Sequence, residues 1–309
     1  MNVSVAVIAY NAENTIVCTL TSILGQDYGA DRVDLVISDD ASTDATVEVV
    51  KKWIDKYGSY FYSVRLIENK INIGVTANYN LACRSCTEEW IKLIAADDML
   101  LDNCLSSNID YIKKEPSAKI VFSYMEWFGS VKKVTPSASQ LSFFKLDAKK
   151  QNSLFRYFSF NVAPTQFIKG SLLKDIGYAD ERYRQMEDLP LWLKITSHGE
   201  RLHFNKSVTV KYRVGDSISK TTERFINRDF VRCCLLLNRE GKQEKFLSLG
   251  FLLKTEERLI IRYKLFLSYA LGNKKSFLHA LFFNLIWFVT PLNLFYRAKE
   301  RMLQARVSS

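Results

Sequence analysis

Two adjacent carboxylates, Asp97 and Asp98, follow an apolar run in this chain of 309 residues. Residues 91–95 before them are typical of a buried strand, and neighbouring carboxylates at a strand end are costly to keep charged unless a cation lies between them. Oxygen ligands favour Mg²⁺ or Mn²⁺, which retain water and take further ligands from substrate phosphates. The same pair also suits a helix cap or a solvated turn before Leu100, so both interpretations stand at this point.

The segments that would position these acids alternate between strands and helices. Apolar, β-branched runs predict strands at residues 3–9, 33–38, 64–68 and 90–95. Apolar residues at helical spacing predict helices between them, with Asn14 expected to cap the first and Ser42 or Asp44 the second. Alternation of this kind is typical of a parallel sheet with helices on both faces.

In such a sheet, the loops at the carboxyl ends of the strands bind the ligand. Asp39 and Asp40 come at the end of the second predicted strand, and Asp97 and Asp98 follow the fourth. We therefore expect these four carboxylates at one edge of the sheet, although they come from distant parts of the chain.

The second half of the chain has a different pattern. Longer apolar runs predict strands at 119–127 and 162–168, and residues 129–152 are typical of a loop. After Arg213 the apolar spacing becomes helical, and residues 277–296 form a strongly apolar stretch. We therefore expect a mixed second half of the sheet, followed by a helical extension.

Charge separates the two ends of the chain. Residues 1–200 hold 22 Lys and Arg against 25 Asp and Glu, whereas residues 201–309 hold 21 against 8. A basic segment suits an anionic partner such as a membrane surface or a nucleic acid. Residues 277–296 are borderline for a membrane span, and the basic residues that flank them fit an interfacial segment. Peripheral membrane contact is the prediction, with packing in a helical core, an oligomer contact and a true span as alternatives.

The cysteines and the start of the chain point to a reducing compartment. Six cysteines are irregularly spaced in a chain large enough to need no bridges, which favours free thiols. Cys83 and Cys86 form a lone C-x-x-C with no second pair at zinc spacing, so a structural role is favoured over a redox or metal role. The first residues contain no basic leader and no cleavage site, which predicts no secretory signal.

Several motifs recur in one order along the chain. They are VAVIAYN at residues 5–11, ISDDASTD at 37–44, NIG at 72–74 with Asn78, ADD at 96–98, KDIGYADE at 174–181, MEDLPLW at 186–192, and YRV at 212–214 leading to SIS at 217–219. With these motifs the chain resembles family-2 glycosyltransferases of the GT-A fold, and the resemblance covers roughly residues 1–220.

The resemblance implies an α/β architecture: a Rossmann-like, mostly parallel sheet flanked by helices in residues 1–220, with a basic, apolar helical extension in 221–309. It implies an inverting transferase that moves a sugar from a nucleoside diphosphate sugar, a UDP-sugar being expected, to a hydroxyl group. The expected acceptor is a polyprenyl-diphosphate-linked saccharide of bacterial O-antigen or capsule synthesis. We expect the protein on the cytoplasmic face of the inner membrane.

The same resemblance assigns roles to the acids. Asp98 is expected to ligate Mn²⁺ or Mg²⁺, Asp97 to approach the donor, Asp40 to bond the nucleotide base, and Asp39 to shape the loop. The other residues expected on the donor side are Ala9, Asn11, Asn72, Gly74, Asn78 and Arg213. Ala95 and Ala96 precede the acidic pair and offer no further carboxylate, so one protein carboxylate is expected to hold the metal.

Glu187 and Asp188 open a segment of helical apolar spacing, where acidic residues commonly cap a helix. The resemblance implies that Asp188 is instead the general base, because an acceptor hydroxyl must lose its proton as it attacks the anomeric carbon. Glu187, Trp127 and Tyr183 are expected on the acceptor side, where aromatic faces stack on sugar rings. Core packing is the simpler explanation for the two aromatic residues.

Other classes of protein remain in competition. A noncatalytic nucleotide-sugar binding or scaffold protein would share the motifs, but intact Asp98 and Asp188 argue against it. A Rossmann oxidoreductase is disfavoured because no G-x-G-x-x-G follows the first strand, where Ala9-Tyr10-Asn11-Ala12 stands. Nucleic-acid binding would rest on charge alone, so we expect no nucleic-acid partner.

Overall fold

The computed structural model describes residues 1–129, 131–156, 160–214, 224–240, 249–286 and 289–292. The chain divides into two compact units, Met1–Gly215 and Asp216–Ser309. The predicted boundary at residue 220 lies in 215–223, outside the described residues, as do residues 217–219.

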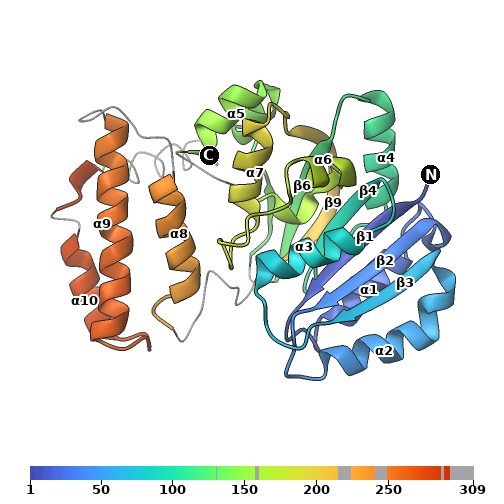
Figure 1. Ribbon diagram of the computed structural model, residues 1–309, viewed down its shortest axis with the longest axis horizontal. Helices are drawn as coiled ribbons and strands as arrows, with labels where there is room; N and C mark the ends of the chain where they lie inside the picture. The colour runs from blue at the N-terminus through green and yellow to red at the C-terminus, as the bar shows by residue number, and fades with distance from the viewer. Residues whose placement is uncertain (130, 157–159, 215–223, 241–248, 287–288, 293–309) are drawn as a thin grey trace. The chain divides into compact units, whose positions relative to one another are not determined.

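A sheet of nine strands forms the centre of the first unit within its described residues (Figure 1). The strands run in the order β3-β2-β1-β4-β8-β6-β9-β5, with β7 paired to β6. Their bounds are Val3–Ala9 (β1), Val33–Asp39 (β2), Ser63–Glu68 (β3), Trp90–Ala95 (β4), Met99–Leu100 (β5), Ile120–Gly129 (β6), Lys133–Thr135 (β7), Phe167–Lys169 (β8) and His203–Val214 (β9).

The first half of the sheet is the parallel α/β part that the sequence predicts. Strands β3, β2, β1 and β4 pair in parallel, and the chain passes between them through α1 (Ile16–Leu24), α2 (Thr46–Tyr57) and α3 (Val75–Ser85). Strands β1 and β2 are buried along almost their whole length, which explains their continuous β-branched and apolar sequence.

The second half is mixed, and two predictions there need correction. Strand β8 is antiparallel to both β4 and β6, and β6 is parallel to β9. The strand predicted at 162–168 is replaced by a 3-10 turn, Ala163–Thr165, and the short β8, because Pro164 has no amide hydrogen for a strand ladder. The loop predicted at 129–152 contains β7, a 3-10 helix at Gln140–Lys145 and most of α5 (Ala148–Phe155).

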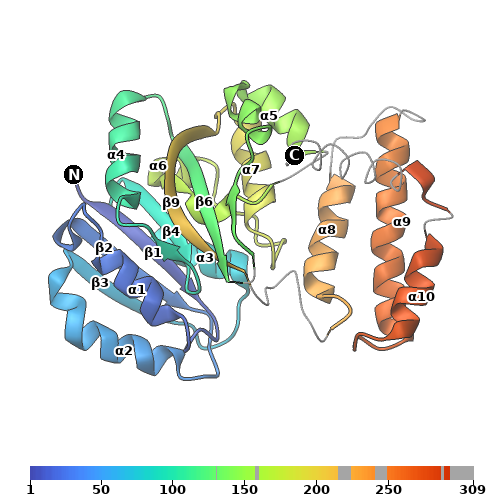
Figure 2. The same ribbon diagram turned by 180° about the vertical axis from the view of Figure 1, so that it is seen from behind.

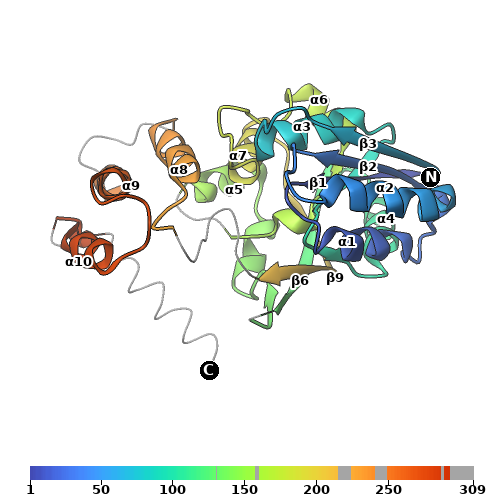
Figure 3. The same cartoon turned by 90° about the horizontal axis from the view of Figure 1, so that it is seen from below.

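Helices cover both faces of the sheet, as Figures 2 and 3 show from two further directions. The core on one face contains residues of α1, α2 and α4 (Cys104–Lys114). The core on the other contains residues of α3, α5, α6 (Gly170–Asp175) and α7 (Asp188–Ser197). The strand residues alternate between the two cores, so each face is closed by its own helical layer.

The predicted caps of the first two helices are largely wrong. Thr15, and not Asn14, precedes α1, and its side chain makes no capping bond. Ser42 lies too early to cap α2 and bonds Asp39 instead. Asp44 does contribute, because its Oδ1 accepts a hydrogen bond from the Thr46 amide at 3.0 Å.

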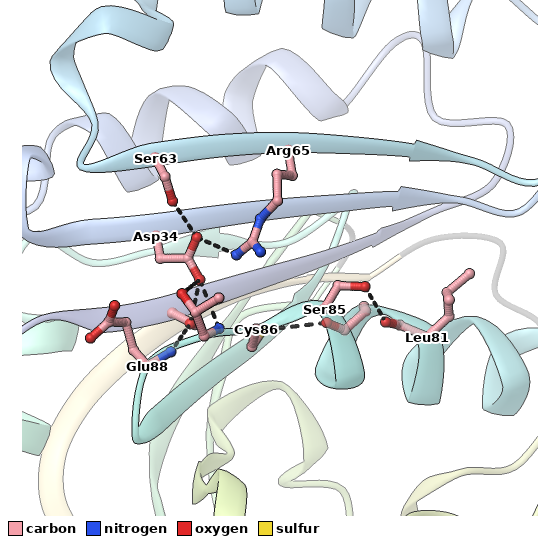
Figure 4. A network of polar contacts seen from close by, with 10 residues as sticks. Asp34, Ser63, Arg65, Leu81, Ser85, Cys86 and Glu88 are labelled. Atoms are coloured by element: carbon pink, nitrogen blue, oxygen red, sulfur yellow. Dashed lines mark hydrogen bonds and ion pairs between the residues drawn. The ribbon is translucent and has the colours of Figure 1, made fainter.

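A buried ion cluster joins the strands at the edge of the sheet where their amino ends lie (Figure 4). Asp34 on β2 is fully buried and accepts hydrogen bonds from Ser4 Oγ at 2.7 Å, from the Ser63 hydroxyl, and from the Thr87 amide at 3.1 Å. Arg65 on β3 forms an ion pair with the same carboxylate at 2.5 Å. One carboxylate thus connects β1, β2, β3 and the α3–β4 loop.

The C-x-x-C pair lies next to this cluster and is structural. Cys83 and Cys86 are both free thiols, and burial raises the pKa of each, so neither is poised as a thiolate. Among the described residues, no group of three or more His, Cys, Asp or Glu side chains is arranged to hold a metal ion.

The second unit is helical in its described part. It contains α8 (Arg228–Glu240), α9 (Leu249–Ala270) and α10 (Phe277–Leu285), and α9 packs against both others. His279 is buried, with Nε2 at 2.9 Å from the Gly272 carbonyl oxygen. No helix in the described part of the chain is both long and apolar enough to cross a membrane.

Candidate active site

The strand register brings the predicted acids to one edge of the sheet. Ala9 at the end of β1 is level with Asp39 on β2, and Ile8 is level with Ala95 on β4. The Ala9 carbonyl accepts a hydrogen bond from the Asp40 amide at 2.8 Å. The prediction that Asp39, Asp40, Asp97 and Asp98 gather at the carboxyl ends of the strands is therefore confirmed.

Asp39 shapes the loop that follows β2. Its Oδ2 accepts a hydrogen bond from the Ser42 amide at 2.8 Å, and Ala41 adopts φ 59° in the turn. Asn11, whose φ is 49°, accepts a hydrogen bond at its side-chain Oδ1 from the Thr43 backbone amide at 2.9 Å. Its own backbone amide donates a hydrogen bond to Ser42 Oγ. The loops after β1 and β2 thus hold one another.

Asp40 holds a third loop in place. It is buried, and its two oxygens accept hydrogen bonds from the amides of Ile73 at 2.7 Å and Gly74 at 2.9 Å. Asn72 adds a bond from its Nδ2 to the Asp40 carbonyl at 3.2 Å. The geometry therefore gives Asp40 a role in positioning the loop, and its bond to a nucleotide base stays a prediction.

Gly74 is required where this loop meets the chain ahead of α7. Its φ is 91°, and a Cβ at this position would lie 2.4 Å from Arg184 Cγ and 2.9 Å from the Arg184 carbonyl oxygen. Arg184 in turn donates to the Asn72 carbonyl at 2.8 Å. The glycine thus permits a close backbone approach.

Asn78 supports the loop from the interior. It is buried, its Oδ1 accepts from Ser38 Oγ at 2.6 Å, and its Nδ2 donates to the Ser38 carbonyl at 3.0 Å. The prediction of a direct contact between Asn78 and the donor is corrected to a supporting role, because its amide is turned into the protein.

Helix α3 connects the loop at residues 72–74, which Asp40 holds, to the segment that leads into Glu187 and Asp188. Thr76 Oγ1 donates to the Tyr183 carbonyl, and Asn80 Nδ2 donates to the Ala179 carbonyl at 2.9 Å. Two sequence motifs about a hundred residues apart are therefore parts of one rigid contact.

Asp98 is held in the loop between β4 and β5. Its side chain is buried, Oδ1 accepts a hydrogen bond from the Arg213 amide at 2.8 Å, and its carbonyl accepts one from Thr19 Oγ1 at 2.6 Å. Burial and the charge of Asp97 raise the pKa of Asp98 well above its usual range. A positive charge beside this pair is therefore favourable.

Arg213 lies against the same loop from β9. Its Nε donates to the Asp97 carbonyl at 2.9 Å, and its guanidinium lies over the Phe128 ring at 4.7 Å from the centroid. The Asp97 side chain itself is exposed. Arg213 is thus placed beside the acidic pair, and its contact with a diphosphate stays a prediction.

Tyr212 is the residue that the sequence analysis missed. It is half-buried on β9, and its ring packs edge-on against Trp127 at 5.4 Å between centroids. Burial raises its pKa, and the charges of Asp98, Asp97 and Asp188 raise it further. The YRV motif was the available signal.

Glu187 and Asp188 stand at the start of α7, but Glu187 does not cap it. The side chain of Glu187 makes no capping bond, whereas Asp188 Oδ1 accepts from the Leu189 amide at 2.6 Å. Burial, followed by the Asp188 charge, raises the pKa of Glu187 to about 7, and burial also raises the pKa of Asp188. A carboxylate whose pKa is raised binds a proton more readily than an ordinary one, which suits proton transfer.

The two predicted aromatic residues differ in position. Trp127 is partly exposed beside Tyr212, and its Nε1 donates to Thr135 Oγ1 at 2.8 Å. The Tyr183 side chain is buried, so its place in an acceptor pocket is corrected to core packing.

The acidic loop suits a divalent cation that keeps ligands for substrate. Its donor atoms are carboxylate oxygens, and one oxygen of Asp98 accepts no hydrogen bond from any residue that the structure describes. No third acidic or His side chain joins Asp97 and Asp98 in the described chain, so water and diphosphate oxygens would complete the shell. The residues present fit Mg²⁺ or Mn²⁺.

An α/β sheet with acidic pairs at its carboxyl edge is the architecture of a GT-A enzyme. The sequence model of Glycosyl transferase family 2 matches residues 4–177. The chain belongs to this family and is a glycosyltransferase, which confirms the predicted family and fold.

Relatives and solved structures agree with this assignment. The chain is 26% identical over 217 residues to the Escherichia coli UDP-Glc:alpha-D-GlcNAc-diphosphoundecaprenol beta-1,3-glucosyltransferase WfaP, covering 69% of this chain and 77% of WfaP. The fold is similar to Staphylococcus aureus TarS 1–349 in complex with UDP-GlcNAc, with a TM-score of 0.60, 19% identity, and coverage of 91% and 78%. It is also similar to the Pyrobaculum calidifontis mannosyltransferase PcManGT with GDP-Man and Mn²⁺, with a TM-score of 0.58, 18% identity, and coverage of 99% and 86%.

Proposed function

We propose that this enzyme transfers a sugar from a nucleoside diphosphate sugar, a UDP-sugar first, to a hydroxyl group with inversion at the anomeric carbon. The observation that carries the proposal is that α3 joins the loop held by Asp40 to the segment leading into Glu187 and Asp188, while Asp97 and Asp98 follow β4 at the carboxyl edge of the sheet. One pair suits the donor diphosphate and the other suits the acceptor. TarS with UDP-GlcNAc and PcManGT with GDP-Man support a nucleotide-sugar donor.

In this mechanism Asp188 accepts the proton of the acceptor hydroxyl as its oxygen attacks the anomeric carbon. Asp98, supported by Thr19 and the Arg213 amide, would hold Mg²⁺ or Mn²⁺, with Asp97 toward the donor. A bound divalent ion neutralises charge that develops on the departing diphosphate. Arg213 approaches the same diphosphate with its guanidinium.

The test is release of nucleoside diphosphate from a panel of UDP-sugars, with Mn²⁺ and membrane extract as the source of acceptor. We expect Asp188→Asn to lower kcat roughly 100-fold or more, because a positioned general base typically contributes 10²–10⁴-fold. Asp98→Ala is expected to abolish the response to added Mn²⁺. Asp175→Asn, an exposed change on α6, is the control and should match the wild type.

Two results would argue for a noncatalytic protein. One is the absence of diphosphate release with every donor. The other is diphosphate release that is equal for the wild type, Asp98→Ala and Asp188→Asn, which would place the activity in the membrane extract.

The acceptor that we propose is a saccharide linked to a polyprenyl diphosphate, in O-antigen or capsule synthesis at the cytoplasmic face of the inner membrane. WfaP, by its name, acts on a sugar joined to diphosphoundecaprenol, which supports an anionic, lipid-linked acceptor. Residues 216–309 hold 17 Lys and Arg against 8 Asp and Glu, and this charge suits an anionic surface.

Helix α10 is the segment that we propose to contact the membrane. Six of its nine residues are exposed apolar side chains: Phe277, Leu278, Ala280, Leu281, Phe282 and Leu285. Lys274 and Lys275 lie exposed just before it. An apolar helix surface next to basic residues is typical of an interfacial segment that lies on a membrane.

A further inference from the structure

A lysine is buried in the sheet below the acidic loop. Lys92 on β4 is fully buried, between Ile91 and Leu93 of the strand that leads to Asp97 and Asp98. None of the ion pairs among the described residues involves it. An ammonium group is rarely buried without a carboxylate partner, because it loses its hydration.

Backbone carbonyl groups take the place of that partner. Lys92 Nζ donates to the carbonyl oxygens of Leu93 at 3.1 Å, Gln166 at 3.3 Å and Pro164. The pairing of β4 with β8 ends at Lys92 and Phe167, so the ammonium continues the connection where the strand ladder stops. Lys92 thus fastens the turn at residues 163–166 to β4.

That turn is itself a junction below the candidate site. Thr165 Oγ1 accepts a hydrogen bond from the Ser123 amide of β6 at 3.1 Å, and Gln166 Nε2 donates to the Tyr79 hydroxyl of α3 at 2.7 Å. A displacement of the turn would therefore reach β6 and α3, and the start of α3 carries the loop that Asp40 holds.

Burial and two neighbouring groups set the pKa of Lys92. Burial lowers its pKa to about 8, whereas the charges of Cys104 on α4 and Asp98 on the acidic loop act to raise it. The ammonium and the acidic loop therefore attract one another through the protein interior, where charges are weakly screened.

We propose that Lys92 is a positioning residue of the transferase site: its buried ammonium, held by three carbonyl oxygens, fixes the 163–166 turn and places a fixed positive charge below the Asp97-Asp98 loop. This proposal rests on the proposed transfer reaction. The departing diphosphate gathers negative charge at this loop, and a preorganised positive charge in a low-dielectric interior stabilises it. A packing role alone would be filled better by an apolar side chain, because β4 is buried along this stretch.

The experiment compares Lys92→Met, Lys92→Arg and Ile94→Met in the full chain. Ile94 is the matched control because it is also fully buried, two residues further along β4, and its replacement alters packing without altering charge. We expect Lys92→Met to lower kcat about tenfold with a smaller change in the donor KM, because the carbonyl oxygens of the turn lose their donor and the positive charge is removed. Lys92→Arg, if it folds, should have a kcat between those of Lys92→Met and the wild type. Ile94→Met should have the kcat of the wild type.

The pH profile gives a second readout that packing would not alter. The wild-type rate should fall as the pH rises through about 8, where Lys92 loses its proton, and Lys92→Met should lack this decline. Lys92→Met with wild-type kcat would overturn the proposal, and so would a loss of activity that parallels a loss of Tm. Lack of turnover by the wild type, in contrast, would be a failure of the proposed function itself.

Discussion

The carboxylates of the candidate site differ in how the protein holds their charge. Asp40 accepts two backbone amide hydrogen bonds from the loop at residues 72–74, one at each of its side-chain oxygens. Asp98 and Glu187 accept fewer such hydrogen bonds, and burial raises the pKa of each. The first arrangement shapes a loop, whereas the second leaves a carboxylate whose charge is stabilised by a cation or neutralised by a proton.

At this scale we expect the transfer rate to depend on pH near neutrality. Burial and the Asp188 charge raise the pKa of Glu187 to about 7, so the pair holds a proton below this pH and releases it above. Because the base must be unprotonated, kcat/KM should rise with pH up to about 7, below the decline that loss of the Lys92 proton predicts near pH 8.

Glu187→Gln removes one titrating group from the pair and should shift this rise to lower pH. Glu115→Gln, an exposed change after α4, is the control. Initial rates of diphosphate release between about pH 5.5 and 8 measure the effect. A profile that is the same in Glu187→Gln and the wild type would contradict the assignment.

At the scale of elements, α3 connects the loop at residues 72–74 to the segment before α7. Its start carries the loop that Asp40 holds, and Thr76 and Asn80 bond the segment before α7. The proposed donor and acceptor sides would therefore be fixed to the same helix. The strands are fixed to one another at the opposite edge of the sheet by Asp34 and its partners (Figure 4).

We expect Asp34→Asn to lower the free energy of unfolding by ~3 kcal/mol, because it breaks a fully buried, multiply bonded carboxylate and leaves Arg65 without its partner. Asp55→Asn on the exposed side of α2 is the control and should change little. Urea unfolding followed by circular dichroism at pH 7 compares the variants, and equal stability of the two would contradict the role of the cluster.

The pH dependence of this effect has a defined sign. Hydrogen bonds and the Arg65 charge outweigh burial, so the pKa of Asp34 is lowered in the folded protein. Its stabilisation is then fully present above the unfolded pKa of about 3.9 and is lost as the pH falls through the lower folded value. The difference between wild type and Asp34→Asn should therefore narrow below about pH 4.

At the scale of the whole molecule, charge and catalysis are divided between the units. The unit Met1–Gly215 contains all the predicted site residues, and residues 216–309 carry the excess of basic charge. In the proposed membrane contact, the exposed apolar side chains of α10 would add a second attraction to lipid. This division predicts that membrane binding and sugar transfer to a soluble acceptor can be lost separately.

We expect Phe277→Asp with Leu281→Asp to lower binding to phosphatidylglycerol vesicles at least tenfold, because both side chains are exposed on α10 and the change removes apolar contact. Leu259→Asp, exposed on α9, is the control. Vesicle flotation measures the bound fraction, which for the wild type should also fall from about 0.05 to 0.5 M NaCl. Flotation of the double variant equal to that of the wild type would contradict the membrane assignment. So would a double variant that loses self-association but still binds vesicles, because α10 would then be an oligomer contact.

Much of the parallel half of the fold could be predicted, because its information is local. Runs of buried β-branched residues define β1 and β2, and helical spacing defines α1 and α2. The acids at the ends of β2 and β4 could be placed at one edge because parallel strands share a direction. The helix caps were predicted poorly, since Asn14 and Ser42 have competing hydrogen-bond partners or positions that local patterns do not reveal.

By itself, then, the sequence determined the α/β class, the family and the four acids at the sheet edge. Only the tertiary structure decided that Asp40 and Asn78 support a loop, that Tyr183 is buried, and that Tyr212 packs against Trp127. It also placed Lys92 below the acidic loop, with carbonyl groups as partners. The physical reason is that strand and helix patterns depend on neighbours in the chain, whereas burial and hydrogen-bond partners depend on segments that meet only when the chain folds.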